Sequence, residues 1–218
     1  MSSSPSNGTA ICRRRVFPKR GSQQFFSLLY APSPCRIAPS MHIGLISDTH
    51  IPETGPELPP QVYDALRGVD LILHAGDMHV IDVLDWLESI APVLGARGNG
   101  DYLTHSNKNR PGVPDDPRVK VAHVLQLEEL RVGLIHGFPL PEEVPWRTLE
   151  ELLDMYFGGP VDVVVCGDTH EARVDHSSGL LIVNPGSPTL PNQLRRLGHV
   201  GFLDIHGRNA QASILQLT

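Results

Sequence analysis

Acidic, amide and imidazole side chains follow five short apolar segments of this 218-residue chain, and these are side-chain types that bind divalent metal ions. In four of these five places a glycine lies next to the polar residues. The polar segments that follow the apolar runs are SDTH at 47–50, HAGD at 74–77, RGNGD at 97–101, IHG at 135–137 and CGDTH at 166–170. One such segment is a weak signal, since a lone Asp motif is more often a turn or a helix N-cap. Five in order indicate one shared site.

The apolar pattern between these segments indicates how they can meet. Short apolar runs alternate with amphipathic stretches from Met41 onward, which predicts an α/β protein. In such proteins the carboxyl ends of the strands line the ligand crevice. The expected strands are 42–47, 69–74, 92–98, 119–127, 131–136 and 161–166, the expected helices are 59–68, 79–90 and 145–157, and the expected hairpins are 171–183 and 199–217.

The ligand types in these segments favour a particular metal chemistry. Carboxylate, amide and imidazole groups suit Mn, Fe(II), Zn or Ni, and no thiolate is present to favour a softer site. One ion would not use them all, whereas two ions about 3.5–4 Å apart, bridged by one carboxylate, would. That arrangement is the usual machinery of phosphate-ester hydrolysis. Glycine before Asp77, Asn99 and Asp168 lets the backbone approach an ion closely.

The ordered set resembles the calcineurin-like metallophosphoesterase superfamily, whose pattern is DxH, GD, GN, a His near Gly, and GHxH. Three features resemble the small bacterial and archaeal phosphodiesterase branch of this superfamily: HAGD, the GNxD form, and NPGS at 184–187. The retromer subunit with the same fold is related to that branch. The resemblance covers residues 41 to about 206. It implies an α/β fold that is a four-layer αββα sandwich of two mixed β-sheets flanked by helices, with two metals at the strand tips.

The resemblance also implies a role for each motif residue. Asp48 and His50 would bind the first metal with His170, Asp77 would bridge both ions, and Asn99 and His136 would bind the second. A hydroxide held by the ions would attack phosphorus in line, with Asp77, Asn99 and Asp48 in the catalytic machinery. The expected cofactor is two divalent ions, with Mn preferred and Ni, Zn, Fe or Mg as alternatives. The expected metal ligands are Asp48, His50, Asp77, Asn99, His136, Asp168 and His170.

Two positions depart from the family pattern. Asp168 stands where GHxH has its first His, and it either binds the second metal, favouring a harder ion such as Mn or Mg, or orients His136 from the outer shell. Gly100 stands where phosphatases and nucleases of the superfamily place a His, which leaves Asp101 without its expected partner. General-acid help is typically worth about 10²–10⁴-fold, so we expect weak catalysis on basic leaving groups. Alternative donors are His74, His79 and His105.

These residues lead to three functional hypotheses. The first is a metal-dependent phosphodiesterase acting on a small phosphodiester. The second is a phosphomonoesterase, which the missing His after Asn99 counts against. The third is a non-catalytic binding scaffold, in which degenerate metal sites would retain little metal. The loop at 105–118, with Lys108, Arg110 and Arg118, is a candidate substrate rim.

Charge and composition bound the other properties. Residues 1–40 hold six basic residues and no acid, so the chain's net charge of −6 leaves −12 for residues 41–218. Such an acidic body disfavours nucleic acid as a partner. We expect 1–40 to be a disordered basic tail, either a targeting segment or a mis-called leader, and 41–218 to be a single domain. No stretch nears the roughly 20 apolar residues of a membrane span. Three cysteines without a CxxC pair predict reduced thiols and a cytoplasmic location, with Cys166 buried.

Overall fold

The computed structural model describes residues 40–139 and 147–218, with the side chain of His105 excepted. The predicted tail therefore lies outside the described residues apart from Ser40, as do the first two residues of the helix expected at 145–157. Within the described ranges, no helix combines the length and apolar character needed to cross a bilayer.

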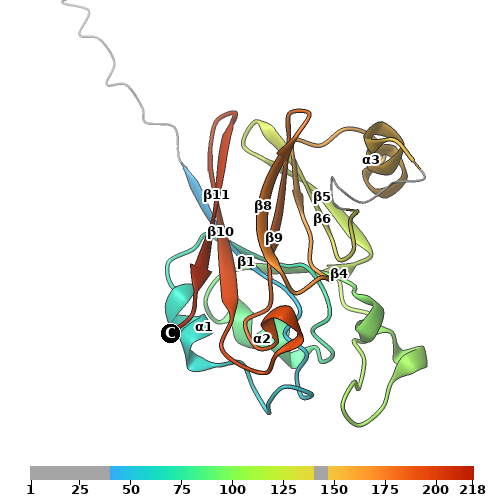
Figure 1. Cartoon of the computed structure of the whole chain (residues 1–218), viewed down its shortest axis with the longest axis vertical. Helices are drawn as coiled ribbons and strands as arrows, with labels where there is room; N and C mark the ends of the chain where they lie inside the picture. The colour runs from blue at the N-terminus through green and yellow to red at the C-terminus, as the bar shows by residue number, and fades with distance from the viewer. Residues whose placement is uncertain (1–39, 140–146) are drawn as a thin grey trace, which may run out of the picture. The chain divides into compact units, whose positions relative to one another are not determined.

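Two mixed β-sheets form the body of the protein (Figure 1). The first has the strand order β11-β10-β1-β2-β3-β4 and the second β5-β6-β7-β9-β8. The first sheet contains β1 (Met41–Ile46), β2 (Leu71–His74), β3 (Val93–Ala96), β4 (Val119–Lys120), β10 (His199–His206) and β11 (Asn209–Gln216). The second contains β5 (Ala122–Leu127), β6 (Leu130–Ile135), β7 (Val163–Val165), β8 (Ala172–Ser177) and β9 (Leu180–Pro185).

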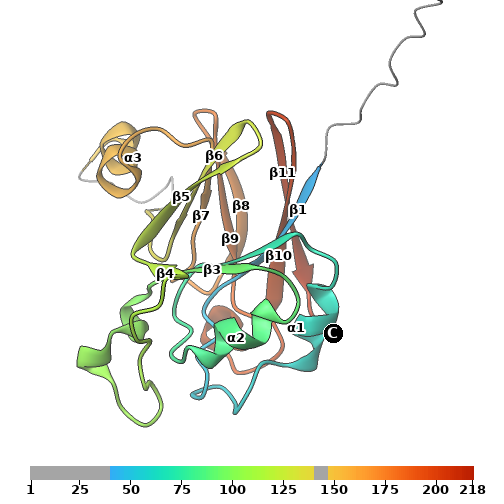
Figure 2. The ribbon, with the colours of Figure 1, turned by 180° about the vertical axis from the view of Figure 1, so that it is seen from behind.

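Successive apolar residues of a strand face opposite sides of each sheet, so that one side packs against the other sheet and the outer side packs against helices. In β1, Ile43 and Leu45 face the core between the sheets, whereas Ile46 joins the core beneath α1 (Pro60–Ala65) and α2 (Asp82–Glu88). In β7, Val163 faces the same central core and Val164 packs with α3 (Leu149–Phe157). The order of layers is therefore helix, sheet, sheet, helix, the αββα sandwich that the resemblance implied. Figure 2 shows α1 and α2 beside the first sheet and α3 beside the second.

Local sequence signals account for the ends of the helices. Pro60 is the first residue of α1, where its missing N–H costs nothing. Thr148 caps α3 by accepting a hydrogen bond from the backbone N–H of Glu151, whose carboxylate accepts one from the N–H of Thr148. The helix ends at Gly158, whose φ of 65° suits glycine.

The run at 119–127, expected as one strand, divides between the two sheets. β4 pairs with β3 in the first sheet, and β5 pairs with β6 in the second, with Val121 60% exposed at the crossing. Periodicity reveals that such a run is extended, but its partners depend on tertiary packing, which the pattern does not encode. The crossing is reinforced by His123 in β5, whose Nε2 lies 3.0 Å from the carbonyl oxygen of Gly95 in β3.

Parallel pairing brings the strand tips together. β1, β2 and β3 run parallel in the first sheet, and β6, β7 and β9 run parallel in the second. The loops after β1 and β2 are joined by a hydrogen bond from the N–H of Asp48 to the carbonyl of Gly76, 2.9 Å long. The loops after β6 and β7 are joined in the same way, from the N–H of Gly167 to the carbonyl of His136 at 2.8 Å. Four of the five polar segments are thus fixed in pairs by backbone bonds.

Candidate metal centre

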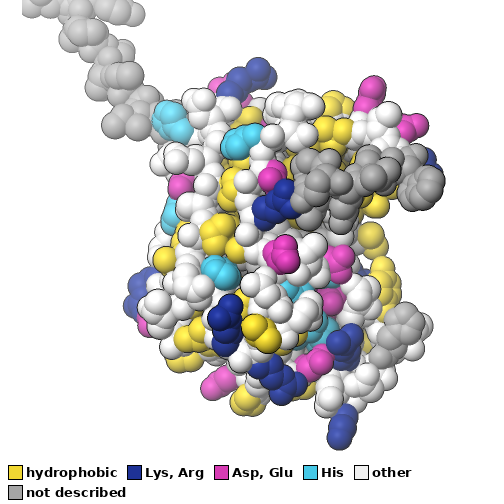
Figure 3. Space-filling view, viewed as in Figure 1, with side chains coloured by type: hydrophobic (Ala, Val, Ile, Leu, Met, Phe, Trp, Pro, Cys, Tyr) yellow, Lys and Arg dark blue, Asp and Glu magenta, His cyan; other side chains and the backbone are white. Residues whose placement is uncertain are grey.

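The structure gathers into one cluster all seven side chains selected from the sequence. In the part of the chain that the structure describes, histidine and acidic side chains are visible together on the lower half of the face in Figure 3. They come from the loops after β1, β2, β3, β6 and β7. The cluster consists of Asp48, His50, Asp77, Asn99, His136, Asp168 and His170.

One side of the cluster is buried and rich in imidazole. Nε2 of His170 lies 3.5 Å from Oδ1 of Asp48, and Nε2 of His50 lies 3.9 Å from the same oxygen. Nε2 of His50 is also 3.5 Å from Oδ2 of Asp77. All four residues are buried. We call Asp48, His50 and His170 the first ligand group.

The other side is richer in oxygen and partly open. Nε2 of His136 lies 3.5 Å from Oδ1 of Asp77, 3.1 Å from Oδ1 of Asn99 and 3.5 Å from Oδ1 of Asp168. We call Asn99, His136 and Asp168 the second ligand group. Asn99 and Asp168 are exposed, so this side faces solvent. Asp77 stands between the groups, with Oδ2 toward the first and Oδ1 toward the second.

Two of the histidines are oriented by backbone carbonyls. Nδ1 of His136 lies 2.7 Å from the carbonyl oxygen of Ala75, and Nδ1 of His170 lies 2.9 Å from that of Leu190. A carbonyl only accepts, so each Nδ1 carries a proton and each Nε2 is the nitrogen turned toward the cluster. A bond of this kind is what orients the ring of a metal-binding histidine.

The loops that carry these candidate ligands share an unusual backbone conformation. Positive φ angles are uncommon for residues other than glycine and cost on the order of 1–3 kcal/mol each, so they cluster where function requires them. Three D-x-H segments have this conformation at both their Asp and their His. The residues are Asp48 (52°), His50 (50°), Asp77 (54°), His79 (68°), Asp168 (73°) and His170 (61°).

The middle D-x-H segment, at 77–79, brings into the cluster a residue that the sequence analysis treated only as a substitute donor. His79 is 0% exposed, and its ring centroid lies 4.4 Å from that of His50. The signal was present in the sequence, since Asp77-Met78-His79 repeats the spacing of Asp48-Thr49-His50. Burial lowers the pKa of His79 to about 3, so its imidazole is neutral at pH 7.

Asp101 has backbone partners in place of the absent histidine. Its carboxylate accepts hydrogen bonds from the N–H groups of Asp77 at 3.0 Å, His79 at 2.8 Å and Gly98 at 2.8 Å. It therefore holds the loop after β2 against the loop after β3. Burial outweighs these bonds and raises the pKa of the Asp101 carboxyl to about 6.

The carboxylates and His136 influence one another strongly. The adjacent ring of His136, 3.5 Å away, holds the pKa of the Asp168 carboxyl below its usual range. Burial would raise the pKa of Asp48, but the adjacent His50 and the charges of His136 and His170 outweigh it and lower that pKa. For His136, burial acts to lower the pKa, but Asp168 and the charges of Asp48 and Asp77 prevail and raise it to about 9. In the metal-free site at pH 7, His136 therefore holds a second proton, on Nε2.

This proton leads to a testable pH dependence of metal binding. A metal binds neutral imidazole, so an ion that enters the second ligand group must displace about one proton from His136 at pH 7. Because the pKa of His136 is raised to about 9, the affinity of the second ligand group for a metal ion should rise about tenfold per pH unit between pH 6 and 8. Calorimetric titration in buffers of different ionisation enthalpy measures the release. Metal uptake without proton release at pH 7 would contradict the assignment.

Several buried atoms in the cluster are suited to a cation. Within residues 40–139 and 147–218, hydrogen-bond partners are absent for Oδ1 of Asp48, both ring nitrogens of His50 and both ring nitrogens of His79. Leaving such a group unpaired typically costs about 1–3 kcal/mol. The oxygen and nitrogen atoms that face one another across 3.5–4.0 Å are too far apart to bond directly. The residues present fit divalent metal ions.

The candidate substrate rim at 105–118 is only partly beside the cluster. Nε of Arg110 lies 2.9 Å from Oε2 of Glu53, and that carboxylate oxygen is 3.8 Å from Nδ1 of His50. Arg118 instead makes ion pairs with Asp116 and with acids of α2. Arg110 therefore borders the cluster, whereas Arg118 is held by acids on another part of the surface.

Asn184 supports a loop of the cluster, and Cys166 is buried as expected from the sequence. The side-chain amide of Asn184 donates to the carbonyl of Gly167 at 2.8 Å and to the hydroxyl of Thr169 at 3.0 Å, which supports the loop after β7. Cys166 is 1% exposed in the core beneath α3. Burial raises the pKa of its thiol to about 12, so it remains protonated and is a poor metal ligand.

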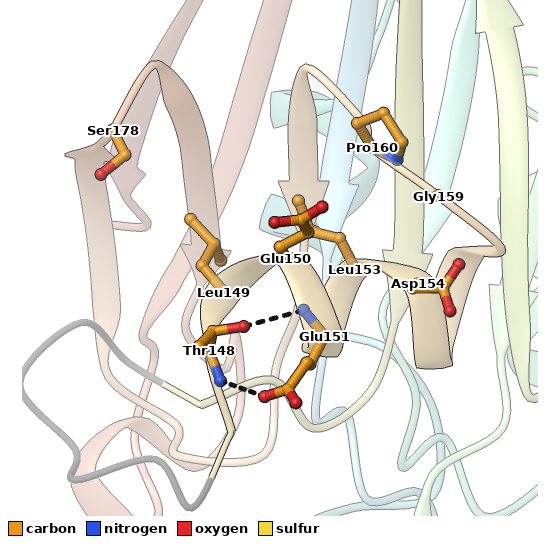
Figure 4. Close-up of a pocket in the computed structure, with 9 residues that line it drawn as sticks. All are labelled: Thr148, Leu149, Glu150, Glu151, Leu153, Asp154, Gly159, Pro160 and Ser178. Atoms are coloured by element: carbon orange, nitrogen blue, oxygen red, sulfur yellow. Dashed lines mark hydrogen bonds between the residues drawn. The ribbon is translucent and has the colours of Figure 1, made fainter.

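A separate pocket of about 720 Å³ lies along α3, between the start of that helix and the turn at Ser178 (Figure 4). Its described lining includes the carboxylates of Glu150, Glu151 and Asp154, and no histidine or cysteine. One of these carboxylates is already used in the helix cap. We assign no chemistry to this pocket, and none of the seven cluster residues lines it.

Comparisons with known proteins agree with the motifs. Residues 41–208 match the model of the calcineurin-like phosphoesterase superfamily domain. A probable metallophosphoesterase of Methanothermobacter thermautotrophicus is 40% identical over 176 residues, which cover 81% of this chain and 92% of that one. A second probable metallophosphoesterase, from Methanocaldococcus jannaschii, is 35% identical over 70% of each chain. A phosphodiesterase of the same organism is 24% identical over 81% of this chain and all of its own.

Solved structures share the fold. Vacuolar Protein Sorting 29 from Cryptosporidium parvum superposes with a TM-score of 0.58 at 21% identity, covering 82% of this chain and 98% of that one. At this identity the similarity extends to the fold alone. The two mixed sheets and outer helices therefore have a known counterpart.

Proposed function

Since the chain belongs to the calcineurin-like phosphoesterase superfamily, whose members use divalent metals, we propose that it is a two-metal phosphodiesterase acting on a small phosphodiester. The observation that carries this proposal is the position of Asp77. Its two carboxylate oxygens each lie 3.5 Å from a histidine of a different ligand group. A carboxylate shared between two groups of ligands is what a pair of bridged ions requires.

The first ion would be held by Asp48, His50 and His170, and the second by Asn99, His136 and Asp168, with Asp77 common to both. When bound, such ions supply an activated water at neutral pH and positive charge for the phosphoryl oxygens. The protein's own contribution is to hold the ligands in place. The buried carboxylate of Asp48, whose pKa is lowered, and two histidines oriented by backbone carbonyls provide that rigidity.

We assign Asp168 as a ligand and not as an outer-shell residue. A carboxylate that only orients a ligating histidine bonds the ring nitrogen turned away from the metal. In His136 that nitrogen is Nδ1, which already bonds the carbonyl of Ala75. Asp168 instead lies beside Nε2, on the same side as Asp77 and Asn99. This placement, with two oxygen donors in the second ligand group, supports Mn as the ion there, with Mg as the alternative.

The substrate side of the proposal rests on what surrounds the second ligand group. Asn99 and Asp168 are exposed, so a phosphate ester would approach from this side. Gly100 offers no side chain to protonate a leaving oxygen, which supports a diester with a good leaving group over a monoester. The net charge of −12 outside the basic tail disfavours nucleic acid as the substrate.

The test compares a diester with a monoester. The full chain is stripped of metal, reconstituted with Mn²⁺, and assayed on bis(4-nitrophenyl) phosphate and on 4-nitrophenyl phosphate. We expect kcat/KM for the diester to exceed that for the monoester by at least about tenfold, since the monoester gains more from a general acid. A preference for the monoester would favour a phosphomonoesterase. Negligible metal binding and no turnover of either ester would favour a binding scaffold.

A further inference from the structure

His79 lies in a position that the seven proposed ligands do not explain. It is wholly buried, although histidine is a polar residue, and neither ring nitrogen has a hydrogen-bond partner among the described residues. His74, the last residue of β2, shows the ordinary alternative. It is equally buried, but its Nε2 lies 3.2 Å from the hydroxyl of Thr49 and its Nδ1 accepts from the N–H of Gly76 at 3.1 Å. His79 thus lacks the bonds that normally accompany burial.

The ring nitrogens of His79 face the same two carboxylates as those of His50. Nε2 of His79 lies 4.0 Å from Oδ2 of Asp77, the oxygen that is 3.5 Å from Nε2 of His50. Nδ1 of His79 lies 3.9 Å from Oε2 of Glu53, the oxygen that is 3.8 Å from Nδ1 of His50. Both rings therefore present Nε2 to the same oxygen of Asp77 and Nδ1 to the same oxygen of Glu53.

Gly100 makes room for this placement. A Cβ at position 100 would overlap Nε2 of His79, so a side chain there and His79 in this position exclude each other. The backbone N–H of Gly100 also donates to Oδ1 of Asp77 at 2.7 Å, which leaves Oδ2 free for the side on which His79 and His50 lie. The glycine that departs from the family pattern is thus linked to the position of His79.

We propose that His79 is an additional ligand of the first ion, beside His50, and that Glu53 is a positioning residue whose carboxylate faces Nδ1 of both histidines. The inference rests on the proposed two-metal function and deepens it. The first ligand group would then offer three imidazoles, from His50, His79 and His170, and the second only one. Imidazole-rich sites favour Zn, Ni or Fe over Mn and Mg, whereas carboxylate and amide oxygens favour the latter. The two halves of the centre should therefore select different metals.

The test uses the full chain, stripped of metal and titrated with Zn²⁺ alone. The wild type should bind one Zn²⁺ more tightly than the next, and His79→Gln should weaken that first event by at least about tenfold. His123→Gln is the matched control, because it removes a buried histidine that bonds the carbonyl of Gly95, outside the cluster. It should leave the first zinc affinity unchanged.

X-ray absorption on the form with one zinc gives a readout that a purely structural role would not change. Three imidazole ligands in the wild type and two in His79→Gln are expected. Two imidazoles in the wild type, or equal zinc affinity in wild type and His79→Gln, would overturn the role of His79 and leave the two-metal proposal standing. A wild type that binds no zinc and no Mn²⁺ would overturn both. If His79→Gln does not fold, the imidazole count of the wild type decides alone.

Discussion

Asp77→Asn is expected to lower phosphodiester turnover by at least about a thousandfold. The variant keeps an oxygen that can accept from the N–H of Gly100 but removes the charge shared by the two ligand groups. Metal ions contribute several kcal/mol of charge stabilisation in such reactions, and about 4 kcal/mol corresponds to about a thousandfold in rate. Turnover of bis(4-nitrophenyl) phosphate at saturating Mn²⁺, together with bound metal per chain, measures the effect.

The matched control for this variant is Asp82→Asn. Asp82 is an exposed residue of α2 that none of the ligand groups contains, so its replacement should leave turnover and metal content unchanged. The metal-free Asp77→Asn protein should be at least as stable as the metal-free wild type, because it lacks one of several buried like charges. A variant that keeps two ions and at least a tenth of the activity would show that Asp77 is not shared between them.

Gly98→Ala is expected to have an effect nearly as large, although glycine has no chemistry of its own. An added Cβ would overlap both Oδ1 and the backbone nitrogen of Asp77. The φ of −84° and ψ of 172° at Gly98 are open to any residue, so the effect would arise only from the displaced Asp77. We expect turnover to fall by about a hundredfold or more, and stability to fall by about 1–3 kcal/mol, as overpacked sites do.

Gly55→Ala is the control for this steric effect. The nearest atom to a Cβ at Gly55 would be 3.8 Å away, which is an ordinary contact. That variant should retain its metal content, its turnover and its midpoint of denaturation. A Gly98→Ala protein with normal metal binding would mean that Asp77 can move without loss of the site.

Much of the candidate centre could be predicted from the sequence because its proposed ligands lie where strands end. Asp48, Asp77 and Asp168 each follow a buried apolar run, and parallel strands bring such ends to one edge. The burial pattern of β1 and β7, with alternate residues facing different cores, follows from the same apolar runs. Pattern and residue type were sufficient for these features.

Other features depend on tertiary contacts that no local pattern contains. The role of Asp101 comes from the N–H groups of Asp77 and His79, more than twenty positions earlier in the chain. The change of sheet at Val121 depends on which strand edge is free to pair. The burial of His79 follows from the missing side chain at Gly100, a coupling between two loops. Motif spacing identified candidates, whereas packing decided which of them meet.

The measurement that tests the central claim most directly is the rate of bis(4-nitrophenyl) phosphate hydrolysis by the metal-stripped full chain as Mn²⁺ is added, recorded beside the number of ions bound. Two ligand groups that share Asp77 predict two bound ions per chain and a rate that rises mainly as the second site fills. A hydrolysis rate that is already maximal with one bound ion per chain, or that persists without any ion, would contradict a two-metal phosphodiesterase.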